Sequence, residues 1–241
     1  MKERSEMMKV TALLTGKGNN TLKDKNLLDI LGHPALFYPA NAAKKCALID
    51  EFYCSSDSEM ILREAEKLGY MRIVRPDRLA QPDSQHEDCI KHALEVMKDE
   101  PDILVVLLAN NVSVRTEWIK ECIEMMQKDS SITAVVPVYA DNDHHPLRAK
   151  RMNKEGFLEM YEEGVEGEVS SNRQDLPTCY FLAHNFWVLN VKSMLSNTKG
   201  QAPWKFMGDV IKPYVIDGAA DIHHEADVYV ATHWVEHMYI D

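Results

Sequence analysis

Short apolar runs alternate with longer segments of mixed polar and apolar residues over the first part of the chain. Ile103–Leu108 has six apolar residues in succession, which is typical of a strand buried on both faces of a sheet. Four further runs predict strands at 10–15, 49–55, 71–74 and 133–139. The helices expected between them cover residues 34–45, 56–68, 84–98 and 116–128. This alternation predicts an α/β fold with a doubly wound, mostly parallel sheet that helices cover on both faces.

Residues that favour helix starts accompany each expected helix. Pro34 suits the first turn of a helix, because its missing N–H is not needed there. Thr116 is a suitable N-cap for the helix after the apolar run. The capping-box spacing occurs twice, at Ser56 with Glu59 and at Ser84 with Glu87.

The alternation stops after Tyr139. Residues 140–178 are polar, rich in charged residues and turn formers, and hold only short strand patterns such as Leu147–Met152. A strand is expected again at Tyr180–Leu189 and a last helix at about 225–236. The prediction is therefore one α/β domain with an insertion, the domain being residues 1–139 and 179–241 and the insertion 140–178.

Composition narrows the classes of protein. The chain has 241 residues and a formal net charge of -11, which argues against a nucleic-acid partner, because phosphate backbones require broad basic surfaces. No apolar run approaches the ~18–20 residues of a membrane span, and no signal-peptide pattern follows the first residues. The five cysteines are scattered and lack C-x-x-C spacing, which indicates reduced thiols and a cytoplasmic protein.

The segment after the first expected strand is the first candidate for chemistry, because ligands of open α/β sheets bind outside the carboxyl ends of the strands. It reads TGKGNNTLKDKN, from Thr15 to Asn26. Glycines allow a ligand to approach the backbone closely, and lysines neutralise phosphate charge, so the loop suits a triphosphate. A solvated surface loop with scattered lysines is the alternative that the same residues allow.

This loop resembles the A-R-G-G-S-K-G-x-x-x-K-N segment of the N-acylneuraminate cytidylyltransferase family, whose relatives activate KDO, legionaminic and pseudaminic acids. The resemblance continues in order along almost the whole chain. It rests on YCSSD at 53–57, RP and LA at 75–76 and 79–80, LLANNVSVRT at 107–116, RQDLP at 173–177 and DIHHEAD at 221–227. It implies a nucleotide-diphospho-sugar transferase-like fold, and an insertion that pairs two subunits and reaches into the partner's active site.

The resemblance also implies an activity and site residues. The chain would transfer CMP from CTP to the anomeric hydroxyl of a sialic-acid-like nine-carbon sugar acid, with release of pyrophosphate, for a cell-surface polysaccharide or glycan. Lys17, Lys25 and Asp221 would be catalytic, with Asp221 binding Mg²⁺. The nucleotide would contact Gly16, Gly18, Asn19, Asn20, Lys23, Asn26, Asp57, Arg75 and Asn110. The sugar acid would contact Arg173, Gln174 and Lys150.

Three departures from the family pattern stand out. The loop arginine is replaced by Gly16 or Lys17, and the glutamine of the fourth strand's end has become Ala109, so that Asn110 or Asn111 takes its place. His223 stands where the family has a second aspartate, and histidine is a poorer ligand for Mg²⁺. Asp209 is an alternative source of a second metal ligand.

Two other functions stay open on these residues. The first is an enzyme of the same fold that activates another acid, such as KDO or a phosphonate. The second is a catalytically degenerate, nucleotide-binding dimer. The sequence does not identify the sugar acid.

Overall fold

The computed structural model describes residues 8–18, 20–164, 167–196 and 199–238, and its centre is an eight-stranded sheet. Seven strands follow the order β10-β7-β11-β6-β1-β4-β5, and β12 pairs with β7. Their bounds are β1 Val10–Thr15, β4 Glu51–Ser56, β5 Met71–Val74, β6 Ile103–Leu108, β7 Ala134–Ala140, β10 Tyr180–Leu182, β11 Phe186–Asn190 and β12 Ile211–Val215. Only β10 and β11 run against the others, so the predicted mostly parallel sheet is confirmed.

Helices cover both faces of the sheet. α1 (Phe37–Lys44), α2 (Glu59–Lys67) and α4 (Thr116–Lys128) share one apolar core with the strands. α3 (His86–Val96) and α5 (Val191–Ser196) belong to a second core on the other face. This arrangement explains why β6 is apolar at every position, since both of its faces are buried.

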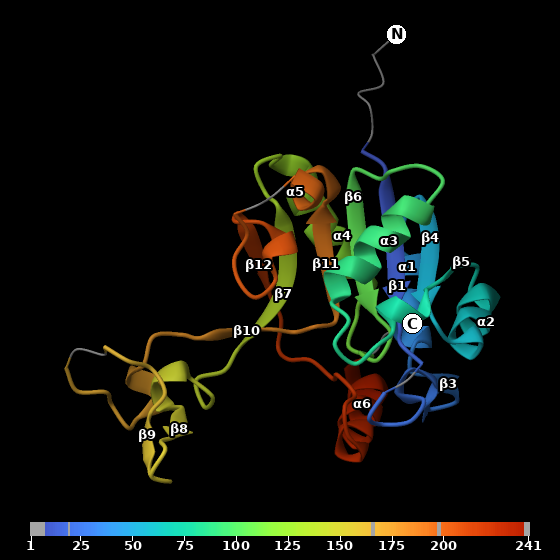
Figure 1. The fold of residues 1–241 in the computed structure, drawn as a ribbon. Helices are drawn as coiled ribbons and strands as arrows, with labels where there is room; N and C mark the ends of the chain where they lie inside the picture. The colour runs from blue at the N-terminus through green and yellow to red at the C-terminus, as the bar shows by residue number, and fades with distance from the viewer. Residues whose placement is uncertain (1–7, 19, 165–166, 197–198, 239–241) are drawn as a thin grey trace.

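A third, smaller core lies beyond one end of the sheet. It joins the hairpin of β2 (Asp29–Ile30) and β3 (His33–Pro34) to α6 (Glu225–Met238). Ala231 and Val235 are the buried residues of α6, which packs against the hairpin at the bottom of the view in Figure 1. Two distant parts of the chain thereby meet next to the loop that follows β1.

The chain crosses from one side of β1 to the other. From β1 it continues to β4 and β5 on one side, and then returns to β6 on the opposite side. Thr15, at the end of β1, lies level with Ser55 of β4 and Leu108 of β6. Such a switch point opens a crevice at the carboxyl ends of the strands, so the loops after β1 and β6 are placed to share a ligand.

Residues between β7 and β10 leave the sheet and form an arm that projects from the body of the molecule (Figure 1). We use "the arm" for residues 141–179. It contains the hairpin of β8 (Lys150–Met152) and β9 (Leu158–Met160), and the short 3-10 helices η3 (Pro146–Arg148) and η4 (Arg173–Asp175). Three further 3-10 helices lie in the body: η1 (Lys25–Leu27), η2 (Asp77–Leu79) and η5 (Lys205–Met207).

The helix predicted at 116–128 is confirmed as α4, but the predicted capping residues were wrong. Pro34 lies in β3, and α1 begins three residues later at Phe37. Ser58, not Ser56, caps α2, because Ser56 is the buried last residue of β4. Ser84 caps nothing, since its hydroxyl donates to Arg78 O and accepts from the Gln81 N–H. Thr116 instead donates its hydroxyl to Ala42 O, a contact between α4 and α1.

The strand expected at 180–189 is two strands. His184, with a φ of 48°, turns the backbone between β10 and β11.

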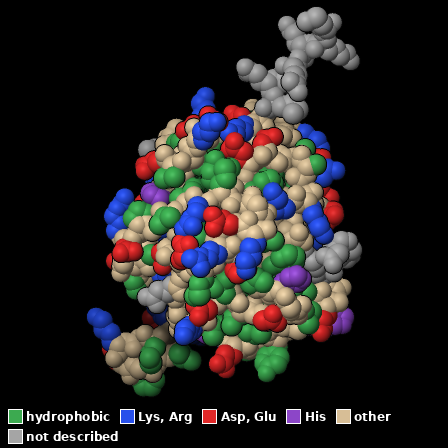
Figure 2. Space-filling model, turned by 90° about the vertical axis from the view of Figure 1, so that its right-hand side faces the viewer, with side chains coloured by type: hydrophobic (Ala, Val, Ile, Leu, Met, Phe, Trp, Pro, Cys, Tyr) green, Lys and Arg blue, Asp and Glu red, His purple; other side chains and the backbone are tan. Residues whose placement is uncertain are grey.

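On the face that Figure 2 shows, Lys and Arg side chains lie next to Asp and Glu, and this face has no broad basic area. In the part of the chain described, no helix combines the length and apolar character that crossing a bilayer requires.

Candidate functional site

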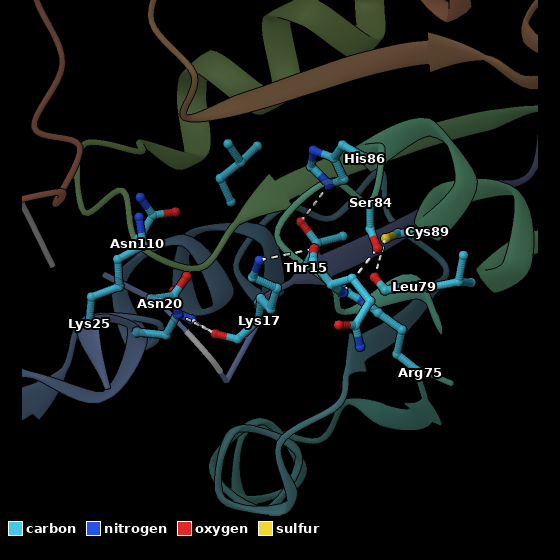
Figure 3. A pocket seen from close by; sticks show the side chains of 14 residues that line it. Thr15, Lys17, Asn20, Lys25, Arg75, Leu79, Ser84, His86, Cys89 and Asn110 are labelled. Atoms are coloured by element: carbon cyan, nitrogen blue, oxygen red, sulfur yellow. Dashed lines mark hydrogen bonds between the residues drawn. The ribbon is translucent and has the colours of Figure 1, made fainter. Parts of the chain in front are cut away.

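Two adjoining hollows lie at the carboxyl ends of β1 and β6. The inner hollow has a volume of about 220 Å³ and the outer hollow about 460 Å³, and Lys17, Asn20 and Lys25 line both. The inner hollow is also lined by Thr15, Gly16, Asn26, Arg75, Leu79, Gln81, Ser84, His86, Cys89, Leu108 and Asn110 (Figure 3). The outer hollow adds Thr21, Leu22, Pro82 and His223. The crevice expected from the strand order is therefore present.

The loop after β1 is held in shape by two side-chain amides. Asn26 is 2% exposed, and its Nδ2 donates to Lys17 O at 2.8 Å. Asn20 Nδ2 donates to the same oxygen (Figure 3). Two donors on one carbonyl fix the turn, and the turn directs the side chain of Lys17 across the hollow, where Nζ donates to Gln81 O at 3.3 Å.

Both loop glycines stand where a side chain would collide. A Cβ at Gly16 would lie 3.1 Å from Ala109 Cβ, and a Cβ at Gly18 would lie 2.9 Å from Ser58 Cβ. Their N–H groups are not free for a ligand, because Gly16 donates to Ser55 O at 3.3 Å and Gly18 donates to Asp57 Oδ1 at 2.9 Å. The glycines therefore serve close packing of the loop against the residues that follow β4 and β6, and their N–H groups already have partners.

Asp57 does not line either hollow. Its carboxylate accepts the Gly18 N–H and so supports the loop from behind. The structure therefore gives Asp57 a positioning role for the loop, and the expected contact between Asp57 and the cytidine stays a prediction.

Arg75 is a buried cation in the wall of the inner hollow. It is 5% exposed, and its Nη2 donates to Ser55 O at 2.8 Å while Nε donates to Ser55 Oγ at 3.3 Å. Within the described residues, Arg75, Lys17 and Lys25 form no ion pair with a carboxylate. Arg75 is buried and Lys17 and Lys25 are half-buried, so three cations without a carboxylate partner around one crevice indicate a site for a polyanion.

A chain of polar contacts closes the outer side of the crevice. Lys25 Nζ lies 3.3 Å from His223 Nδ1, and His223 Nε2 lies 2.8 Å from Asp221 Oδ2. Asn110 Nδ2 donates to Asp221 Oδ1 and, at 3.2 Å, to Ile222 O. A bridge between Asn111 and Asp221 joins the loop after β6 to the segment before α6, which brings residues more than a hundred positions apart into one site.

Burial lowers the pKa of Lys25. Asp221 and Asp227 counteract this shift, and the positive charge of Lys17 adds to it. The first turn of α6 holds the neighbouring segment, because Asp227 Oδ2 accepts the N–H groups of His223 and His224, both at 2.7 Å.

His86 is a site residue that the sequence did not single out. Thr15 Oγ1 donates its hydrogen to Leu107 O at 3.1 Å, so it can only accept from His86 Nε2, which lies 3.0 Å away. His86 therefore carries its proton on Nε2. Burial lowers its pKa to about 4, and the positive charges of Arg75 and His184 add to the shift.

The pKa of His86 predicts a loss of stability in acid. Because the pKa falls from 6.5 in the unfolded chain to about 4 in the fold, the unfolded state takes up a proton between these values that the native state does not. Lowering the pH from 7 to 4.5 should therefore reduce the unfolding free energy more in the native protein than in His86→Gln, which keeps a donor for Thr15. Urea unfolding at both pH values measures this difference, and equal losses would contradict it.

Several expected site residues lie elsewhere. Lys23 is exposed and lines neither hollow, and Asn19 is outside the described residues. Arg173, Gln174 and Lys150 are exposed on the arm, where Arg173 pairs with Asp143. Asp209 precedes β12, whose amino end is at the edge of the sheet opposite the crevice, so the structure does not bring it to Asp221 as a second metal ligand.

The residues missed from the sequence come mostly from the segment after β5. Gln81, Ser84 and His86 line the inner hollow together with Leu79, which belongs to the quoted LA pair. The RP and LA pairs marked this segment, but its polar side chains were assigned to a helix cap. Thr15 had the weaker signal of being the last residue of the first strand.

Asp221 offers one carboxylate ligand for a magnesium ion. Mg²⁺ takes one or two carboxylates and completes its shell with water and substrate phosphates. Asp221 supplies one such carboxylate beside the outer hollow, and His223 occupies Oδ2 through Nε2 in this structure. The site therefore suits an ion that arrives with a phosphate chain better than an ion held by protein alone.

Comparisons with known proteins match the chain to cytidylyltransferases. The family model described as cytidylyltransferase matches residues 18–159, more than half of the chain. An N-acylneuraminate cytidylyltransferase of Streptococcus agalactiae is 25% identical over 182 residues, which are 74% of this chain and 42% of the relative. A pseudaminic acid cytidylyltransferase of Campylobacter jejuni is 25% identical over 183 residues, 74% of this chain and 76% of the relative.

Solved structures share the fold. A structure of CMP:2-keto-3-deoxy-manno-octonic acid synthetase complexed with CTP has a TM-score of 0.69 at 13% identity, covering 96% of this chain and 100% of that one. A 4-diphosphocytidyl-2C-methyl-D-erythritol synthase from Anaerococcus prevotii has a TM-score of 0.63 with the same identity and coverage. The chain spans 42% of the length of the streptococcal relative, so it matches one part of a longer protein there.

Proposed function

This chain belongs to the cytidylyltransferase family, and we propose that it transfers CMP from CTP to the anomeric hydroxyl of a sialic-acid-like nine-carbon sugar acid, with release of pyrophosphate. One observation carries the proposal. Lys17, Lys25 and Arg75 line a crevice at the switch point of the sheet without carboxylate partners, in a chain with a net charge of -11. An acidic protein that gathers unpaired cations at one crevice is built to bind a polyanion there.

The two hollows divide the nucleotide between them. We place the cytidine in the inner hollow, where Arg75, Gln81 and Ser84 offer polar groups of the kind that recognise a base and a ribose. We place the triphosphate where the hollows meet, because Lys17 and Lys25 line both. The acceptor would then approach from the outer hollow, beside Asp221 and His223.

The chemistry needs positioning more than covalent help. The anomeric hydroxyl attacks the α-phosphorus in line with the departing pyrophosphate, the bond from the α-phosphorus to the bridging oxygen breaks, and the hydroxyl proton passes to solvent. Lys17 and Lys25 hold the phosphates and neutralise their charge. Magnesium bound at Asp221 and the phosphates would add further charge neutralisation. We propose the cytoplasm as the compartment, since CTP is available there.

The arm supports the proposal that the protein is a homodimer. The hairpin of the arm exposes four large apolar side chains: Met152 at 71%, Phe157 at 70%, Leu158 at 74% and Tyr161 at 60%. Apolar groups gathered in this way on a surface typically mark a site of association. In one chain Arg173, Gln174 and Lys150 line neither hollow. A second copy would cover the apolar residues and allow these polar ones to reach the partner's crevice.

The dimer makes a prediction about the arm. Introducing charge with Phe157→Asp and Leu158→Asp should convert a dimer into a monomer, because two buried apolar contacts would be replaced by like charges. Light scattering coupled to size-exclusion chromatography measures the mass. Tyr229→Asp is the matched control, since Tyr229 is 80% exposed on α6 and should leave the dimer intact. A native protein that is monomeric at micromolar concentration would contradict the proposal.

Pyrophosphate release tests the function itself. The protein is incubated with CTP, Mg²⁺ and each of several acids: N-acetylneuraminic, legionaminic and pseudaminic acid, KDO, and a phosphonate. Release with a nine-carbon acid supports the proposal, and release with only KDO or the phosphonate would assign another acceptor. CTP binding without release for any acid would indicate a degenerate nucleotide-binding protein.

A further inference from the structure

The exposed face of α6 carries three metal-ligating side chains that the nucleotide site does not use. His233, Glu236 and His237 lie three and four residues apart, so they share one face of the helix. One ligand atom from each residue lies within 4.8 Å of the other two. All three residues are exposed, and their rotamers can adjust without disturbing a core.

A hydrogen bond prepares one of these histidines for a metal. His237 Nδ1 lies 2.9 Å from His233 O. A carbonyl oxygen only accepts, so Nδ1 carries the proton and Nε2 of the neutral ring keeps its lone pair. Histidines that bind metals usually donate their other ring N–H in this manner, which fixes the tautomer and the ring orientation. The His233 ring lies beside it, with the ring centroids 4.2 Å apart.

We propose that His233, Glu236 and His237 form a surface site for a borderline divalent transition metal of the Zn²⁺ class. Two imidazoles and one carboxylate suit Zn²⁺, Co²⁺, Ni²⁺ or Cu²⁺, whereas Mg²⁺ and Ca²⁺ prefer oxygen ligands alone. Tetrahedral bonds of about 2.0–2.2 Å place ligand atoms about 3.3 Å apart, and small rotations of exposed side chains close that gap. Three protein ligands leave a fourth position for water or an outside ligand.

The site is separate from the crevice. His233 lies eight residues along α6 from Glu225, which is about 12 Å at 1.5 Å per residue. A metal there would join two turns of a helix whose first turn holds the segment of His223 through Asp227. Because a metal that binds only the folded helix stabilises it, Zn²⁺ should also raise the melting temperature.

Calorimetric titration of the untagged protein with Zn²⁺, in excess Mg²⁺ and CTP to occupy the crevice, tests the site. The native protein should bind one equivalent that the double variant His233→Asn, His237→Asn binds at least about tenfold more weakly. Glu236→Gln should weaken binding by a smaller factor. His144→Asn is the matched control, because His144 is an exposed histidine on the arm, and it should bind as the native protein does.

The same titrations can overturn the proposal. Equal stoichiometry and affinity in the native protein and the double variant would show that Zn²⁺ binds elsewhere, and no binding by the native protein would exclude the site. Circular dichroism checks that each variant keeps α6. Co²⁺ provides a second readout, since its visible absorption should change from an octahedral to a tetrahedral spectrum only when both histidines are present.

Discussion

Replacing Asp221 by asparagine is expected to lower kcat by about a thousandfold, equivalent to about 4 kcal/mol in the barrier. The side chains have nearly the same shape, and asparagine can still accept from Asn110 through its carbonyl oxygen. The change therefore removes the negative charge that would attract a metal ion to the phosphates, while the segment before α6 keeps its place. Pyrophosphate release at saturating CTP and acceptor measures kcat.

The matched control for this charge removal is Asp209→Asn. Asp209 is an exposed carboxylate at the opposite edge of the sheet, and its loss should leave kcat unchanged. Near-normal turnover by Asp221→Asn would show that the metal binds elsewhere. A loss of CTP affinity in the absence of metal would instead indicate that the variant had disturbed the crevice.

Replacing Lys25 by methionine is expected to lower kcat/KM for CTP by about a hundredfold or more. Lys25 lines both hollows and is partly removed from water, so its charge acts on a bound phosphate with little screening. Methionine keeps most of the side-chain volume and removes only the charge. Initial rates at low CTP concentrations measure kcat/KM.

Lys23→Met is the matched control, because the sequence predicted a nucleotide contact for Lys23 and the structure places it outside both hollows. Lys23 belongs to the same loop, but it is exposed and outside both hollows. We therefore expect Lys23→Met to lower kcat/KM for CTP by less than about threefold. Similar losses in the two variants would show that the whole loop, and not the lining of the crevice, binds CTP.

The lowered pKa of Lys25 adds a pH dependence. In the proposed function Lys25 binds phosphate as a cation, and its charge is lost as the pH rises through a pKa below that of an exposed lysine. The profile of kcat/KM for CTP reports the free enzyme, so it should fall on the alkaline side earlier than ordinary lysine titration would cause. Lys25→Met should lack this alkaline fall.

The order of strands and helices could be read from the sequence because it depends on local patterns. A run such as Ile103–Leu108 is apolar at every position only where both faces of a strand are covered, and the core confirms this. The loop from Thr15 to Asn26 was found for a related reason, since the end of the first strand in an α/β sheet is a defined position. The helix at 116–128 was predicted with its exact bounds, but the capping residues were not predictable, because Ser84 and Thr116 found partners elsewhere.

The sequence by itself determined the α/β sheet, the loop that lines the crevice and the family resemblance, because each depends on residues close together along the chain. Tertiary structure alone decided which loop residues line the two hollows, that Asp57 supports Gly18, and that Asn110 meets Asp221. It also placed His86 in the wall of the inner hollow. Those facts depend on contacts between residues far apart in the chain, and their geometry exists only once the sheet has brought its strand ends to one edge.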